Sequence, residues 1–230
     1  MSKEKNKNKE NEKINFSLLQ NNYNSSNNQT TGNVLVVNNA LSNELYNNLE
    51  KEYISLKKLF IVNQSIKNNN ESRNILLSNF NYMINSETAL TLSDDIITPL
   101  WKDFIKYHTS RYFINEIQKQ NQLNQHITVN LTLNYMSPIL YQSTTKINQM
   151  NSNFAFLGFF FMKNSNDNSK VNNLEIFENE KRIISIPYQK NTFILIKNKN
   201  KNENGNNITF GFTEKNYTIS SMKYIKFILL

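Results

Sequence analysis

The sequence predicts an α+β fold in which helices of the N-terminal half brace a β-barrel or β-sandwich. Before residue 125, apolar residues recur with helical spacing, whereas the later chain carries short apolar runs and period-two alternation. Strands and helices do not alternate regularly, which argues against a parallel sheet with crossover helices. Helices first and strands afterwards therefore favour an antiparallel core that is covered by helices.

The chain is expected to form one domain, residues 33–230, preceded by an arm. A length of 230 residues with 38% hydrophobic content suffices for one substantial core. Asparagine makes up roughly a fifth of the chain, a strong compositional bias. Residues 1–32 are mostly Lys, Glu, Asn, Gln and Ser, so little apolar burial can offset the entropy of ordering them. We therefore expect residues 1–32 to be a disordered Asn/Lys-rich arm.

Three helices are expected before the strand-rich part. Ser42 suits an N-cap, and the apolar face of the helix after it holds Leu45, Leu49, Tyr53 and Leu56. Pro99 suits the first turn of a second helix, whose apolar stripe holds Leu100, Trp101, Phe104 and Ile105. A turn at residues 108–110 separates it from a third helix, which buries Phe113, Ile114 and Ile117.

Most of the strands are expected after these helices. A short apolar β-type run at residues 34–37 comes first. Apolar and polar residues then alternate over residues 127–135, the pattern of a strand with one buried face. The continuous apolar run 154–162 predicts a central strand that is buried on both faces. Further short strands are expected at residues 174–177, 183–186, 192–196, 208–212 and 224–229.

Charge and cysteine content narrow the classes of function. The net charge is +8, but the lysines are dispersed among asparagines and form no basic face with interleaved aromatic residues, so no nucleic-acid partner is expected. The lack of cysteine excludes disulfides, thiolate nucleophiles and Cys-ligated metal sites. No apolar stretch is long enough to cross a membrane and no signal-like segment follows Met1, so we expect a cytoplasmic protein without membrane association.

Five segments, taken in order, resemble a known family. They are residues 101–113, 158–162, 172–176, 187–193 and 223–228, with the sequences WKDFIKYHTSRYF, GFFFM, NNLEI, PYQKNTF and KYIKFI. In these segments the chain is similar to the bacterial and viral 2-oxoglutarate/Fe(II)-dependent oxygenases, which are prolyl 4-hydroxylase-like proteins. The resemblance covers most of the chain after residue 34. It implies a double-stranded β-helix (jelly-roll) core braced by N-terminal helices.

The same resemblance implies that the iron ligands are missing. Such enzymes hold Fe(II) with two histidines and one carboxylate, which leaves positions open for the co-substrate and oxygen. Here the His-x-Asp positions fall on Asn148 and Met150, and the distal histidine falls on Phe210. The position that pairs with the co-substrate carboxylate falls near Lys223, which keeps the charge of an arginine without its fork geometry. Neither a catalytic residue nor a bound cofactor is therefore expected.

The chain contains two histidines, His108 and His126, neither of which is expected to lie where the family gathers its ligands. We interpret His108 as a packed junction residue, and Asp94 with Asp95 as a charge pair at the start of a helix. Three hypotheses remain open. The protein is a pseudoenzyme that binds a small anion or glycan, or an active dioxygenase that holds Fe(II) and 2-oxoglutarate at an atypical site. The third is a structural or interaction jelly roll.

Overall fold

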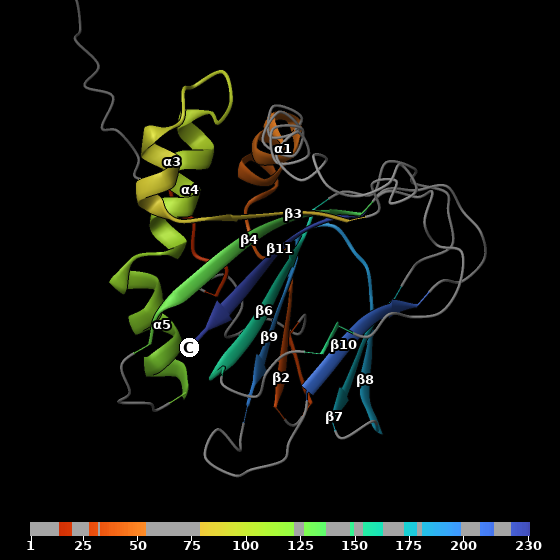
Figure 1. The fold of residues 1–230 in the computed structure, drawn as a ribbon. Coiled ribbons are helices and arrows are strands. Elements are labelled where there is room, and N and C mark those ends of the chain that lie inside the picture. The colour runs from red at the N-terminus through yellow and green to blue at the C-terminus, as the bar shows by residue number, and fades with distance from the viewer. Residues whose placement is uncertain are drawn as a thin grey trace, which may run out of the picture.

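The computed structural model describes residues 14–19, 28–31, 33–53, 79–121, 127–136, 148–149, 154–162, 173–178, 181–198, 208–213 and 222–230. Its strands form a seven-stranded and a four-stranded antiparallel sheet, and helices cover the face of the larger sheet that is turned away from the smaller one (Figure 1). The α+β class and the jelly-roll arrangement predicted from the sequence are therefore confirmed. In the described ranges, no helix is long and apolar enough to cross a membrane.

The first half of the chain contributes β1 (Asn28–Thr31), β2 (Val34–Asn38), α1 (Asn43–Glu52), β3 (Asn79–Ile84), α3 (Ser86–Thr91), α4 (Pro99–His108) and α5 (Arg111–Asn121). The predicted helix starts are confirmed, because the Ser42 hydroxyl accepts a hydrogen bond from the Leu45 amide at 3.3 Å and Pro99 opens α4 behind the N-cap Thr98. The sequence did not predict β1, β3 or α3. Leu56, which was expected on the apolar face of the helix after Ser42, lies outside the described residues.

The second half contributes β4 (Val129–Met136), β5 (Asn148–Gln149), β6 (Phe156–Phe161), β7 (Asn173–Glu178), β8 (Lys181–Pro187), β9 (Thr192–Lys197), β10 (Ile208–Thr213) and β11 (Met222–Leu229). The strand order is β1-β2-β9-β6-β11-β4-β3 in the large sheet and β5-β10-β7-β8 in the small one. All strands predicted after residue 125 are confirmed, and in the described part of this half the two-residue β5 is additional. The last strand, β11, lies between β6 and β4 in the middle of the large sheet.

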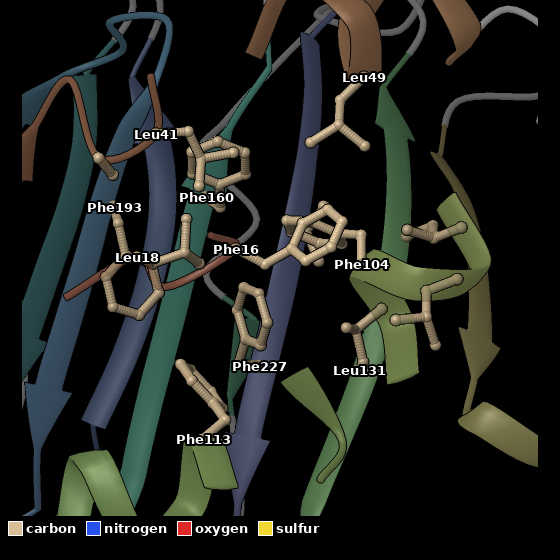
Figure 2. Packing of buried hydrophobic residues seen from close by; sticks show 14 of the residues in the cluster. Phe16, Leu18, Leu41, Leu49, Phe104, Phe113, Leu131, Phe160, Phe193 and Phe227 are labelled. Carbon is tan, nitrogen blue, oxygen red and sulfur yellow. The ribbon is translucent and has the colours of Figure 1, made fainter. Parts of the chain in front are cut away.

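The large sheet has an apolar layer on each face. The helix-side core lies between this sheet and the helices, and Figure 2 shows part of it. It includes Leu49, Phe104, Phe113, Phe160, Phe193 and Phe227. The inter-sheet core lies between the two sheets and includes Val36, Leu157, Phe159, Phe161, Ile176, Ile194 and Phe210. Because successive residues of a strand point to opposite faces, β6 supplies both layers, which explains its uninterrupted apolar sequence.

Residues 14–19 pack into the helix-side core, although residues 1–32 were expected to be disordered. Phe16, Leu18 and Leu19 are all buried, and the Phe16 ring meets Phe104 edge to face with centroids 6.1 Å apart (Figure 2). The Ser17 hydroxyl donates a hydrogen bond to a Glu116 carboxylate oxygen at 3.2 Å. Residues 14–19 thus contain four apolar residues that the average composition of the arm conceals, and β1, which has none, pairs with β2 through its backbone.

Asn191 joins two loops that are distant in the sequence. Its side chain donates a hydrogen bond to the Leu41 carbonyl at 2.9 Å and accepts one from the Leu41 amide at 3.0 Å. Its backbone carbonyl accepts from the Ala40 amide at 2.9 Å, and its amide donates to the Phe161 carbonyl at 3.0 Å. The residue is buried and adopts a left-handed backbone with φ of 55°. Asn191 therefore ties the entry of β9 to the loop between β2 and α1.

Candidate functional site

The structure brings together two of the positions that the resemblance assigned to iron ligands. Phe210 of β10 pairs directly with Asn148 of β5 across the small antiparallel sheet. On its other side, Phe210 pairs with Ile176 of β7. Met150 and His126 lie outside the described residues, so their predicted roles remain predictions.

Phe210 is part of the inter-sheet core. It is 1% exposed, and its ring meets Phe159 of the opposite sheet edge to face with centroids 4.9 Å apart. Such aromatic pairs add to the free energy gained from burial. The position expected for the distal histidine is therefore filled by a carbon ring that holds the two sheets together.

The two described positions, Phe210 and Asn148, do not by themselves fit Fe(II). Iron of this family needs nitrogen and carboxylate donors, and a phenyl ring offers none. An asparagine amide, as at Asn148, is a weak ligand by comparison. Within the described ranges, no three His, Cys, Asp or Glu side chains group closely enough to hold a metal ion. No oxidation step can be derived from the residues at these positions.

Lys226 is a polar residue of the inter-sheet space that sequence reasoning missed. Its Cα partners are Thr132 of β4 and Phe159 of β6, so it shares their face of the large sheet. Its Nζ lies 5.8 Å from the centroid of the Phe210 ring. The lysine is half-buried, and this burial lowers its pKa from the usual value of 10.5. The amine of Lys226 thus lies beside the Phe210 ring, at the position where the resemblance implies the distal histidine.

Strand alternation was the signal that could have found Lys226. Ile225 and Phe227 belong to the helix-side core, so the residue between them points to the other face. Lys223 is three residues earlier, and its position therefore belongs to the face opposite that of Lys226. The structure describes Lys223 as a position in β11 that pairs with Tyr135. Its predicted contact with a co-substrate carboxylate stays a prediction.

His108 lies on the other face of the large sheet, among residues of the helix-side core, and has a structural environment. It is completely buried at the end of α4, and its ring contacts Phe104, Phe113 and Phe227 at centroid distances of 4.1, 4.7 and 5.5 Å. Its Nδ1 donates a hydrogen bond to the Phe104 carbonyl at 2.8 Å. Burial lowers its pKa to about 3, so the imidazole is neutral. The interpretation of His108 as a packed junction residue is confirmed.

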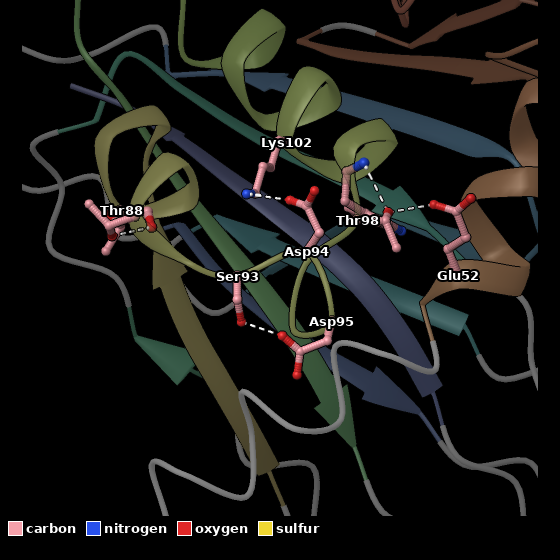
Figure 3. A network of polar contacts seen from close by, with 9 residues as sticks. Glu52, Thr88, Ser93, Asp94, Asp95, Thr98 and Lys102 are labelled. Atoms are coloured by element: carbon pink, nitrogen blue, oxygen red, sulfur yellow. Dashed lines mark hydrogen bonds and ion pairs between the residues drawn. The ribbon is translucent and has the colours of Figure 1, made fainter.

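The acidic pair before α4 also has structural partners (Figure 3). Asp94 forms an ion pair with Lys102 at 2.7 Å, and Asp95 accepts a hydrogen bond from the Ser93 hydroxyl. The hydroxyl of Thr98, the N-cap of α4, donates to a carboxylate oxygen of Glu52 in α1. Asp94 and Asp95 precede α4, whose first turn has no acidic residue, so the predicted charge pair at the start of a helix is confirmed only in that Asp94 pairs with Lys102 of α4.

Comparison with known proteins gives a likeness in structure and none in sequence. No protein-family model and no curated protein matches the chain. Among solved structures, the dioxygenase for auxin oxidation 1 from Arabidopsis thaliana, in complex with 2-oxoglutarate, aligns with a TM-score of 0.56 at 12% identity. That alignment covers 86% of this chain and 83% of the plant protein.

Two further structures agree with this likeness. A prolyl-4-hydroxylase from Pseudomonas putida aligns with a TM-score of 0.52 at 5% identity over 85% of this chain and 91% of that chain. A prolyl hydroxylase from Trichoplax adhaerens aligns with a TM-score of 0.50 at 10% identity over 87% of this chain and 84% of that chain. At such identities the likeness concerns the fold alone. The chain therefore has the double-stranded β-helix fold of the 2-oxoglutarate/Fe(II)-dependent oxygenases.

Proposed function

We propose that this domain is an oxygenase-like binding protein without oxygenase turnover, which holds a small carboxylate between its two sheets at Lys226. The observation that carries the proposal is the contact between Lys226 and Phe210. A buried ring stands at the position where the resemblance implies a ligand, and the amine of Lys226, which can carry a positive charge, lies beside it. The described part of the site thus keeps a group that can bind an anion, while neither Phe210 nor Asn148 supplies a donor of the kind that holds iron in this fold.

Electrostatics supports an anionic ligand. A lysine removed from water loses hydration energy, and an opposite charge that hydrogen-bonds to it restores part of that energy. Within the described residues no carboxylate forms an ion pair with Lys226, since the ion pairs there join Lys102 with Asp94 and Arg182 with Glu175. A bound carboxylate would supply this missing partner and form a charge-assisted hydrogen bond with Nζ.

The fold supports Lys226 over Lys223 as the residue that binds. In the resemblance, the last core strand supplies the cation that pairs with the co-substrate carboxylate, and β11 is that strand here. Lys226 faces the space between the sheets, and Thr132 stands next to it on β4. Thr132 is 8% exposed.

Calorimetric titration with succinate and with 2-oxoglutarate tests the binding part of the proposal. We expect both dicarboxylates to bind the wild-type protein, Lys226→Met to abolish binding, and the matched control Lys223→Met to leave it unchanged. Methionine keeps the length of the side chain and removes the charge. Binding that persists in Lys226→Met would contradict the role of this residue.

Turnover and metal analysis test the non-catalytic part. We expect Fe(II) and 2-oxoglutarate to give no succinate beyond a control without protein. Iron-dependent succinate release would overturn the proposal. Stoichiometric iron in the purified protein that is lost in His126→Ala would instead support an active enzyme with an atypical metal site.

A further inference from the structure

Residues 14–19 lie in the helix-side core as a bound peptide would, and we call them the strap. They form neither a helix nor a strand. Phe16, Leu18 and Leu19 are buried among side chains of the helices and the large sheet, whereas Ile14 is 51% exposed (Figure 2). The strap therefore enters the core from the surface of the protein.

The strap satisfies part of its own backbone. The Ser17 amide donates a hydrogen bond to Asn15 Oδ1 at 3.0 Å, and the Leu19 amide donates one to the Ser17 hydroxyl oxygen at 3.3 Å. Both bonds stay within the segment, so movement of the strap out of the core does not break them. A strand that leaves a sheet, by contrast, loses its ladder of backbone hydrogen bonds.

The side chains that receive the strap are Phe104, Tyr107 and Glu116, and we call them the strap site. The centroid of the Phe16 ring lies 6.1 Å from those of both Phe104 and Tyr107. The hydroxyl groups of Ser17 and Tyr107 both donate hydrogen bonds to Glu116 Oε2, at 3.2 and 2.8 Å. Burial and the hydrogen bond to Glu116 raise the pKa of Tyr107, so its hydroxyl keeps the proton that it donates. One carboxylate oxygen thus joins α4, α5 and the strap.

The helices that form the strap site are held in place by contacts that do not involve the strap. The indole N–H of Trp101 in α4 donates a hydrogen bond to the Leu49 carbonyl of α1 at 3.1 Å. The rings of His108 in α4 and Phe113 in α5 have centroids 4.7 Å apart. His108 also contacts Phe227 of the large sheet at 5.5 Å. These contacts can hold α4 and α5 on the sheet when the strap is absent.

We propose that the strap is an exchangeable ligand, which leaves the strap site as a unit while the rest of the chain stays folded, and that the vacated site binds the strap of a second copy. A second copy fits because its residues 14–19 carry the same aromatic ring, hydroxyl and two leucines that the site receives here. Exchange of an identical segment makes the same contacts between copies as within one. The strap site lies on the face of the large sheet opposite to Lys226, so the inference is independent of the proposed anion site.

Peptide binding to the full-length protein tests the inference. A fluorescent peptide with the sequence of residues 12–21 is titrated and followed by anisotropy. Phe16→Asp puts a charge among apolar side chains and should free the strap site, whereas Ile14→Asp is the matched control at an exposed position. We expect saturable binding to Phe16→Asp, and binding weaker by about tenfold or more to the wild type and Ile14→Asp, whose own strap competes at high effective concentration. A peptide that carries Ser17→Glu should bind Phe16→Asp about tenfold more weakly, because its carboxylate meets that of Glu116.

Two results of this titration would overturn the inference. One is no saturable binding to a Phe16→Asp protein that keeps the circular dichroism spectrum of the wild type. The other is equal binding to Phe16→Asp and to the wild type, which would place the peptide at another site.

Thiol labelling decides the question if Phe16→Asp does not fold. The chain has no cysteine, so Leu19→Cys in the strap and the matched control Leu131→Cys in β4 each place a single thiol at a buried leucine position. Without denaturant, the Leu19→Cys thiol should react with a maleimide about tenfold faster or more. Excess peptide should speed the reaction further, because it occupies the site while the strap is away. Equal rates for the two thiols would show that the strap leaves only on global unfolding, and a rate that the peptide does not change would contradict binding in trans.

Discussion

Replacing Asn191 should destabilise the protein more than its place in a surface connection between strands suggests. Asn191→Gly keeps the left-handed backbone, because glycine adopts φ of 55° without strain. It removes the two side-chain hydrogen bonds to the amide and carbonyl of Leu41. Both residues are 2% exposed, so water has little access to the groups that lose their partner. The change therefore isolates the contribution of these two bonds.

The expected loss can be worked from these contacts. An unpaired buried polar group costs about 1 to 3 kcal/mol, and Leu41 would have two of them. Local relaxation reduces the sum, so we expect Asn191→Gly to lower the free energy of unfolding by about 2 to 4 kcal/mol. Asn191→Ala should lose about 1 kcal/mol more, since a Cβ atom makes the left-handed backbone unfavourable.

Urea denaturation followed by circular dichroism at 25 °C measures these differences. Asn39 is the matched control, because it is exposed and has a similar backbone with φ of 52°. Asn39→Gly should change the free energy of unfolding by less than about 1 kcal/mol. If Asn191→Gly were as stable as Asn39→Gly, the inference that this side chain ties the two loops together would be wrong.

Three other changes test the packing. His108 has a pKa of about 3 in the folded protein, compared with 6.5 for an ordinary histidine. Below pH 6.5 the unfolded chain therefore binds a proton that the folded chain does not. The free energy of unfolding should fall by about 2 kcal/mol from this residue by pH 5. His108→Gln should remove that slope in urea titrations at several pH values, and His126→Gln should not remove it. Gly158→Ala should cost about 1 to 3 kcal/mol in urea denaturation, because the new Cβ would lie 3.2 to 3.4 Å from core side-chain atoms; an unchanged midpoint would contradict the close packing. Phe16→Ala should lower the free energy of unfolding by about 3 to 5 kcal/mol, while Ile14→Ala, at a half-exposed position, should change it little. Equal melting temperatures of the two variants would support the original expectation that these residues are disordered.

Much of the fold could be predicted because the signals are local. The alternation at residues 127–135 and the continuous run at 154–162 reflect one and two buried faces, and the structure contains β4 and β6 there. The burial of Phe16 was missed because the few apolar residues around it lie in a polar arm and its partners, such as Phe104, are distant in the chain. The sequence of β3, NFNYMI, alternates polar and aromatic residues over its first four positions, a short pattern that could have indicated a strand. Its pairing with β4 is a long-range contact that local patterns do not reveal.

The candidate site could be predicted in part. The resemblance assigned Asn148 and Phe210 to one site from two distant segments, and the structure pairs these positions. It did not identify Lys226, because the matched motif aligns Lys223 with the cation of the family. A motif match alone does not indicate which face of β11 each lysine occupies. Alternation places Lys226 on the face opposite Ile225 and Phe227, and the structure shows that these two residues pack against the helices.

The central place of the last strand has a consequence for how the chain matures on the ribosome. Without β11, β4 and β6 have no hydrogen-bonding neighbour between them, and both would present unsatisfied backbone edges. Synthesis must therefore pass Leu229 before the large sheet can close, and the phenylalanine-rich β6 stays uncovered during elongation. A nonsense codon before Met222 would remove an interior strand. The truncated chain would expose the edges of β4 and β6, so it should aggregate or bind chaperones.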